Sequence, residues 1–167
     1  MNAHNGLKSR ILAYWQYQLG ALLYRSSVAG WHVKLHEFTM KQLQKASHKG
    51  HPKAQQLMAK LLAYRGVGVL DKRAGVALLA TQAQQGDAQS QFLYAEMLLK
   101  SDAILADTQI KALDWYQSAA KQGHAMAALR LSKAYEQGLL GLEQDKAQAE
   151  YWSKQFMQHS KNMSSDS

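Results

Sequence analysis

The feature that most constrains this sequence is a glycine that recurs every 36 or 37 residues among small and polar residues. Gly50 is followed by Gly86 after 36 residues and by Gly123 after a further 37. The next step of 37 arrives at Ser160, where the glycine is missing. A fixed period of about 20–50 residues is typical of stacked units that cannot bury their apolar faces alone. The spacing therefore predicts an array of repeats.

Three further positions recur between the glycines and predict two helices in each repeat. An apolar residue followed by a small one comes first, at Met58-Ala59, Tyr94-Ala95 and Leu131-Ser132. Turn positions follow, at Gly66, Ser101 and Gly138. Aspartates then stand where they would cap the second helix, at Asp71, Asp107 and Asp145. The recurrent glycine suits the left-handed position that closes a helix.

Apolar spacing predicts where the helices lie. Ile110, Leu113, Tyr116 and Ala120 form one stripe, which Ala112, Trp115 and Ala119 widen. The expected helices span residues 7–25, 32–48, 52–64, 72–85, 88–100, 108–122, 125–137 and 145–158. They would form one repeat domain over residues 1–160, with a divergent capping repeat at 7–50 and repeats at 51–86, 87–123 and 124–160. Residues 161–167 are expected to be a flexible polar tail.

These residues resemble the Sel1-like repeat family, a relative of the tetratricopeptide repeats. The segments "GVGV" with Asp71, "ALDWYQSAAKQG", "LSKAYEQG" and "DKAQAEYW" match its pattern, whereas "KSDAILAD" and Leu78 depart from it. The resemblance covers residues 50–160 most clearly. It implies an all-α, right-handed α/α superhelix of about four helix-turn-helix repeats. It also implies a non-catalytic scaffold or adaptor that binds a protein or peptide on its concave face, in a bacterial envelope, secretion or signalling assembly.

The register of the repeats indicates which side chains would contact a partner. Outward-facing positions of the first helices are the candidates, namely Gln56, Lys60, Gln89, Glu96, Arg130 and Lys133.

Charge leaves a second hypothesis open. Residues 1–73 hold twelve Lys and Arg against Glu37 and Asp71, a net +10, whereas residues 74–167 hold eight against ten acids, a net −2. Lys41, Lys45 and Lys49 would form a basic ridge on one helix. The basic half could bind an acidic partner, nucleic acid or an anionic membrane. A solvated helix face would look the same.

The sequence carries no motif that predicts an enzyme, a metal site or a cofactor. The "GVGV" segment lacks the frame of a phosphate-binding loop. His32 and His36 would share a helix face, but a zinc site needs a third ligand. The tryptophans and methionines at repeat positions are interpreted as core, at Met58, Met97, Trp115, Met126 and Trp152.

The N-terminal segment loosely resembles a secretion signal. Gln16 and Gln18 interrupt its apolar run, and Arg25 stands where such a signal is neutral. The chain has no cysteine, which fits a reducing compartment. We therefore expect a cytoplasmic protein without a membrane span, with export as the alternative.

Overall fold

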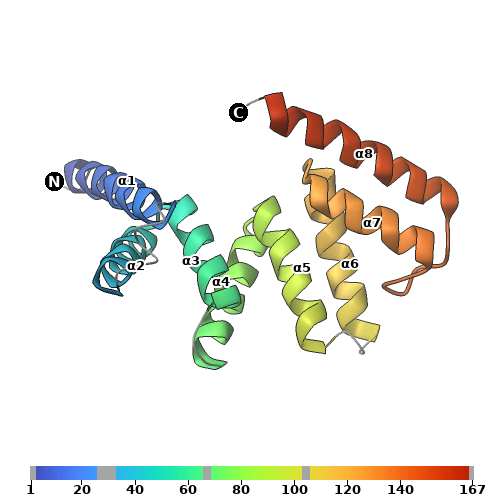
Figure 1. The fold of residues 1–167 in the computed structure, drawn as a ribbon, viewed down its shortest axis with the longest axis horizontal. Helices are drawn as coiled ribbons and strands as arrows, with labels where there is room; N and C mark the ends of the chain where they lie inside the picture. The colour runs from blue at the N-terminus through green and yellow to red at the C-terminus, as the bar shows by residue number, and fades with distance from the viewer. Residues whose placement is uncertain (1–2, 26–32, 66–68, 103–105, 166–167) are drawn as a thin grey trace. The chain divides into compact units, whose positions relative to one another are not determined.

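The computed structural model describes residues 3–25, 33–65, 69–102 and 106–165, and the side chains of 8–22, 38–64, 72–100 and 107–161. Within these ranges the chain is all-α, without a β-strand (Figure 1). The helices are α1 (Ala3–Arg25), α2 (Val33–His48), α3 (Pro52–Arg65), α4 (Val69–Gln84), α5 (Ala88–Asp102), α6 (Ala106–Lys121), α7 (Ala125–Gln137) and α8 (Lys146–Ser165). The chain divides into two compact units, Met1–Leu78 and Leu79–Ser167, and the division falls inside α4.

The first unit is built from helices that pack in chain order, α1 on α2 and α2 on α3. Leu43 of α2 is fully buried and packs with Met58 and Leu61 of α3. Gly20 of α1 lies against Leu43 so closely that an added Cβ would meet its side chain at 2.8 Å. Small and aliphatic residues therefore set the spacing of these helices.

The second unit is a stack in which α5, α6, α7 and α8 each pack on the next helix (Figure 1). Its core centres on Tyr116 and Leu131, which are 1% and 0% exposed. Alanines from α5, α6 and α7 surround them and let the helices approach closely: Ala95, Ala112, Ala119, Ala120, Ala127 and Ala128. Trp152 of α8 is 8% exposed and closes the core, as its repeat position predicted.

The recurrent glycines close the second helix of each repeat, as predicted. Gly50, Gly86 and Gly123 have φ of 78°, 93° and 89°, a left-handed conformation that side chains with a Cβ disfavour. The amide after each glycine donates to the carbonyl five residues back, for example His124 N to Ala119 O at 3.1 Å. This pattern is the Schellman motif, which satisfies the last carbonyls of a helix and turns the chain.

The residue after each glycine caps the first helix of the next repeat, a role that the sequence analysis missed. His51 Nδ1 accepts from Ala54 N at 3.3 Å, and His124 Nδ1 accepts from Ala127 N at 3.2 Å. Asp87 occupies the same position and accepts from Ser90 N at 2.7 Å. Either an imidazole nitrogen or a carboxylate therefore satisfies the free amides there.

The predicted caps of the second helices are only partly right. Asp145 Oδ1 accepts from Gln148 N at 3.0 Å and caps α8, as predicted. Asp107 is not the cap of α6, because α6 begins at Ala106 and Asp107 lies inside its first turn. An acid there still interacts favourably with the helix dipole. The Asp71 side chain lies outside the described side chains.

Other predictions about individual residues also need correction. Ser101 belongs to α5 rather than to a turn, whereas Gly138 ends α7 with φ of 66° as predicted, and Gly66 lies outside the described residues. Ile110 and Met126 are 51% and 44% exposed and are not core, because their helix faces have no covering helix among the described residues. The last helix continues to Ser165, beyond the predicted end at residue 158 and into the segment predicted as a tail.

We expect Gly75→Ala to destabilise the first unit. A Cβ at Gly75 of α4 would lie 2.8 Å from the Ala63 Cα and the Leu62 carbonyl carbon of α3, which are backbone atoms that cannot rotate away. Overpacking of this kind costs about 1–3 kcal/mol and outweighs the roughly 1 kcal/mol that alanine contributes to helix propensity. Urea unfolding followed by circular dichroism measures the change.

Gly20→Ala is the matched control for this prediction. Its Cβ would also meet atoms at 2.8 Å, but these belong to the Leu43 side chain, which can adjust. It should therefore destabilise less than Gly75→Ala. A Gly75→Ala protein as stable as the parent would contradict the close approach of α3 and α4.

We expect the stability to fall between pH 7.5 and pH 5.5. Burial lowers the pKa of His124 below its ordinary value of 6.5, and the pKa of His51 is lowered in the same way. Near and below pH 6.5 the unfolded chain therefore binds more protons than the folded chain. The contribution of these histidines to the free energy of unfolding is fully present above pH 6.5 and is lost as the pH falls below it. Protonated Nδ1 also stops accepting, and losing a cap costs about 0.5–2 kcal/mol.

The variant His124→Asn tests the cause, because asparagine caps a helix without titrating. Thermal unfolding at the two pH values should show a smaller difference for the variant than for the parent. An equal difference in both proteins would show that the His124 cap does not contribute to the pH dependence.

Candidate functional site

A cavity of about 360 Å³ opens beside the first helices of the second unit, α5 and α7. It is lined by Glu96, Leu99, Tyr116, Arg130, Lys133, Ala134, Gln137, Leu139 and Leu140. Three of these, Glu96, Arg130 and Lys133, are residues that the repeat register predicted. The cavity combines an apolar wall with charged side chains at its rim, which is a common composition for binding sites.

An ion pair joins the two helices across this cavity. Arg130 Nε and Nη2 donate to Glu96 Oε1 and Oε2 at 2.7 and 3.1 Å. Tyr116 of α6 donates its hydroxyl to the same Glu96 Oε1 at 2.7 Å. The Glu96 hydrogen bond raises the pKa of Arg130 above its ordinary value, so Arg130 stays charged. The Arg130 side chain is 44% exposed, so the pair contributes about 0.2–1 kcal/mol and chiefly fixes geometry.

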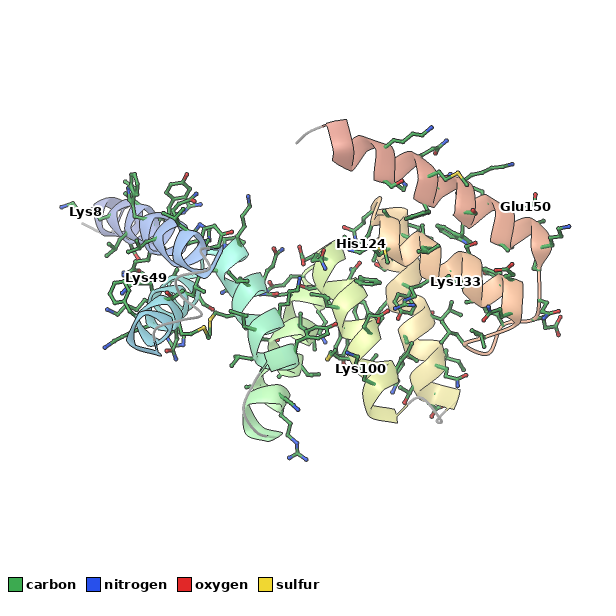
Figure 2. All side chains as sticks on the ribbon, in the orientation of Figure 1. Lys8, Lys49, Lys100, His124, Lys133 and Glu150 are labelled. Atoms are coloured by element: carbon green, nitrogen blue, oxygen red, sulfur yellow. The ribbon has the colours of Figure 1, made fainter. Side chains whose placement is uncertain are left out.

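Lys133 differs from Arg130 because it has no partner within the described part of the chain. It lies one turn after Arg130 on α7 and is exposed to solvent (Figure 2). Its ammonium group is therefore available to an acidic group outside the chain, whereas the charge of Arg130 is already neutralised by Glu96. Of the predicted basic contacts here, Lys133 is the one that can bind a carboxylate without breaking an internal contact.

The other predicted contact residues lie elsewhere. Gln56 and Lys60 are on α3 in the first unit, partly buried and exposed respectively. Gln89 is exposed at the start of α5, where its Oε1 lies 3.3 Å from His124 Nε2. The structure thus brings together Glu96, Arg130 and Lys133 but not all six.

A second cavity, of about 390 Å³, surrounds the junction between α5 and α7. Phe92 stacks on the His124 ring there, with centroids 4.6 Å apart. Because His124 Nδ1 accepts from Ala127, Nε2 carries the proton and points to Gln89. The ring is therefore held by a cap, a stack and a hydrogen bond, so its role at this junction is structural.

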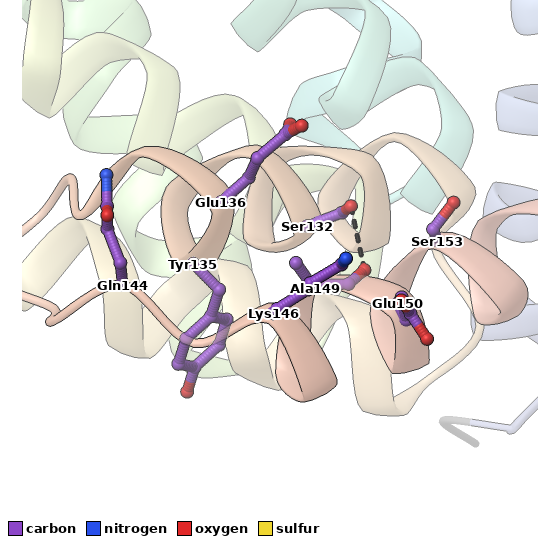
Figure 3. Close-up of a pocket in the computed structure, with 8 residues that line it drawn as sticks. All are labelled: Ser132, Tyr135, Glu136, Gln144, Lys146, Ala149, Glu150 and Ser153. Carbon is purple, nitrogen blue, oxygen red and sulfur yellow. Dashed lines mark hydrogen bonds between the residues drawn. The ribbon is translucent and has the colours of Figure 1, made fainter.

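A third cavity, of about 530 Å³, lies between α7 and α8 (Figure 3). Ser132 of α7 lines this cavity, and its hydroxyl donates to the Ala149 carbonyl of α8 at 2.9 Å. Glu136, Lys146 and Glu150 stand around it with charges of both signs, so it has no clear preference for a charged ligand. Nothing in the sequence had marked these residues as a group.

Sequence reasoning missed the apolar wall of the 360 Å³ cavity. Leu139 and Leu140 follow Gly138, the residue that ends α7, and Leu140 has φ of 59°. The left-handed Gly138 is a signal that could have placed them, because the chain must fold back beside α7 at that point. The repeat register covers helix positions only and therefore overlooked this loop.

The described residues contain no group of three His, Asp or Glu that could hold a metal ion. His32 and His36 lie outside the described side chains. No helix within the described ranges has the length and apolar character needed to cross a membrane.

Comparisons with known proteins agree with the repeat architecture. The Sel1 repeat model matches residues 88–124 and 125–156. No curated protein sequence matches the chain. A Sel1 repeat protein from Oxalobacter formigenes is similar in structure, with a TM-score of 0.61 and 26% identity, over 70% of this chain and 88% of that protein.

Two further crystal structures share the fold. A protective antigen of uropathogenic Escherichia coli with an SLR fold has a TM-score of 0.69 and 23% identity, over 87% of this chain and 30% of its own length. An immunity protein from Pseudomonas aeruginosa has a TM-score of 0.53 and 23% identity, over 71% of this chain and 44% of its own length. This chain thus spans less than half of either protein. Two segments of this chain, residues 88–124 and 125–156, thus match the Sel1 repeat, and its fold is similar to that of solved Sel1-repeat structures.

Proposed function

We propose that this chain is a non-catalytic adaptor that binds a segment of another protein over the cavity between α5 and α7. Sel1 repeats commonly mediate protein–protein interaction, which supports the general class. The single observation that carries the proposal is the cavity of about 360 Å³ on the first helices of both matched repeats. An apolar wall with a few charged groups at its rim is a common composition for a binding site.

The cavity also indicates what the bound segment is like. Leu139 and Leu140 offer apolar contact, and Leu139 is 48% exposed. Lys133 offers a cation without an internal partner in the described structure. A segment with an apolar side chain followed by an Asp or Glu would satisfy both. The ion pair between Glu96 and Arg130 holds α5 and α7 at the spacing that this segment requires.

Site-specific photo-crosslinking in bacterial cells tests this proposal. A photoreactive amino acid at Gln137, an exposed residue of the cavity rim, should crosslink to a discrete protein. The same group at Lys121, exposed at the end of α6 and outside the cavity lining, is the matched control and should not. Equal crosslinking from both positions, or none from Gln137, would contradict the assignment of this cavity as the binding site.

We further expect Lys133→Glu to reduce the yield of this crosslink about tenfold or more, because it places a carboxylate against the acidic segment. Arg130→Ala is a poorer test, since it leaves Glu96 without its partner and changes the cavity itself. Circular dichroism should show unchanged helicity for Lys133→Glu, because Lys133 is exposed. An undiminished crosslink in Lys133→Glu would show that this lysine does not contact the partner.

A further inference from the structure

Helix α1 has an uncovered apolar face. Five of its large apolar side chains are 42–68% exposed: Ile11, Leu12, Trp15, Leu19 and Leu22. At 100° per residue they fall in one stripe about 100° wide, which is hereafter called the α1 stripe. Ala13 and Gly20 lie on the other side of the helix and are buried, Gly20 against Leu43 of α2. Because α1 is apolar on both sides, its composition is that of a helix with two neighbours.

The residues of the later repeats that correspond to the α1 stripe are buried. Leu19-Gly20 aligns with the apolar–small pairs Met58-Ala59, Tyr94-Ala95 and Leu131-Ser132. In this register Trp15, which is 65% exposed, corresponds to three residues that are each 0% exposed: Ala54, Ser90 and Ala127. Leu22, which is 68% exposed, corresponds to residues that are 2–8% exposed: Leu61, Met97 and Ala134.

The second helix of the preceding repeat is what covers these positions. Ser90 of α5 donates its hydroxyl to Gln82 Oε1 of α4 at 2.9 Å. Met58 and Leu61 of α3 pack against Leu43 of α2. The α1 stripe therefore occupies the repeat positions that pack against a neighbouring helix in the later repeats. Among the described residues no helix covers it.

A glutamine in the same register supports this conclusion. Gln55 Nε2 donates to Ser47 O, in the last turn of α2, at 3.3 Å. Gln91 Nε2 donates to Ala83 O, in the last turn of α4, at 3.1 Å. Gln16 holds the equivalent position on α1, where its Nε2 would donate to the last turn of a helix packed against the α1 stripe. The Gln16 amide is thus placed to reach the last turn of a neighbouring helix. In the later repeats that helix belongs to the same chain.

The charge of the first unit indicates the occupant of the α1 stripe. All charged Lys, Arg, Asp and Glu side chains described in the first unit are cations: Lys8, Arg10, Lys41, Lys45, Lys49, Lys53, Lys60, Lys72 and Arg73. A second copy matches poorly, because two such units repel each other and α8 carries three lysines against Glu150 alone. An anionic lipid surface matches the charge but has no carbonyls of a helix end for Gln16.

We propose that the α1 stripe docks an amphipathic helix of a partner protein, with acidic residues flanking the helix's apolar face. Trp15, Leu19 and Leu22 cover that apolar face, and Gln16 donates to a carbonyl in the last turn of the helix. This site is separate from the cavity between α5 and α7 and does not depend on it.

A peptide made from this chain's own second helix is a suitable probe. The sequence of residues 106–123 forms α6 and its closing turn, and α6 packs on α7 within the chain. The changes Lys111→Glu and Lys121→Glu, at two exposed positions, make it acidic without altering its apolar face. Fluorescence anisotropy of the labelled peptide against the full chain measures affinity. We expect saturable binding that is at least fivefold tighter for the acidic peptide than for the unchanged one.

Variants of the full chain locate the binding. Leu19→Gln with Leu22→Gln should weaken binding at least tenfold, and Gln16→Leu about threefold or more, with helicity unchanged. Tyr151→Gln is the matched control, since Tyr151 is 51% exposed but lies on α8. Lys133→Ala should also leave binding unchanged, which separates this site from the adaptor cavity.

Three results would overturn the proposal. The first is equal binding by the Leu19→Gln, Leu22→Gln variant. The second is absence of peptide binding together with binding to phosphatidylglycerol vesicles that this variant loses, which would assign the stripe to a membrane. The third is a dimer in sedimentation that the same variant dissociates, which would assign it to a second copy.

Discussion

The structure depends on each helix being covered by the helices that precede and follow it, at a distance set by small residues. In the second unit Tyr116 and Leu131 are fully enclosed, and alanines around them leave room for the neighbouring backbones. Burying a side chain of this size stabilises the fold by about 1.5–3 kcal/mol. In the first unit Gly75 lets α4 lie directly on the α3 backbone at Ala63. A helical hairpin taken alone would leave the face that its neighbour covers exposed to water.

The joints between repeats turn this packing into a regular spacing. A left-handed glycine ends one helix, and the following residue caps the next, so each joint has the same short geometry. His51, Asp87 and His124 perform the same capping role with different chemistry. As a consequence Glu96 and Arg130, 34 residues apart in the chain, meet at 2.7 Å on neighbouring first helices. The candidate cavity exists because of this spacing.

The two proposed surfaces follow from the same repeat in different ways. The cavity between α5 and α7 uses the side of the first helices that packing leaves open, with Leu139 and Lys133 at its edge. The α1 stripe uses the side that packing normally covers, and Gln16 holds the register position of Gln55 and Gln91, which donate to the end of the preceding helix. The first surface is proposed for a segment of a partner protein and the second for a partner's amphipathic helix.

The sequence by itself determined the period, the helices and the closing glycines, because these depend on local backbone preference and on apolar spacing along the chain. It also indicated that Glu96, Arg130 and Lys133 face outward, since the register of a repeat fixes which side of a helix a residue occupies. Only the tertiary structure decided that Glu96 neutralises Arg130 and leaves Lys133 available, and that Leu139 and Leu140 form the wall. Exposure of Trp15 was likewise decided there, because its repeat position is a covered one in α3, α5 and α7. Pairing and exposure depend on which neighbour is present in space, and a residue's place in a repeat does not contain that information.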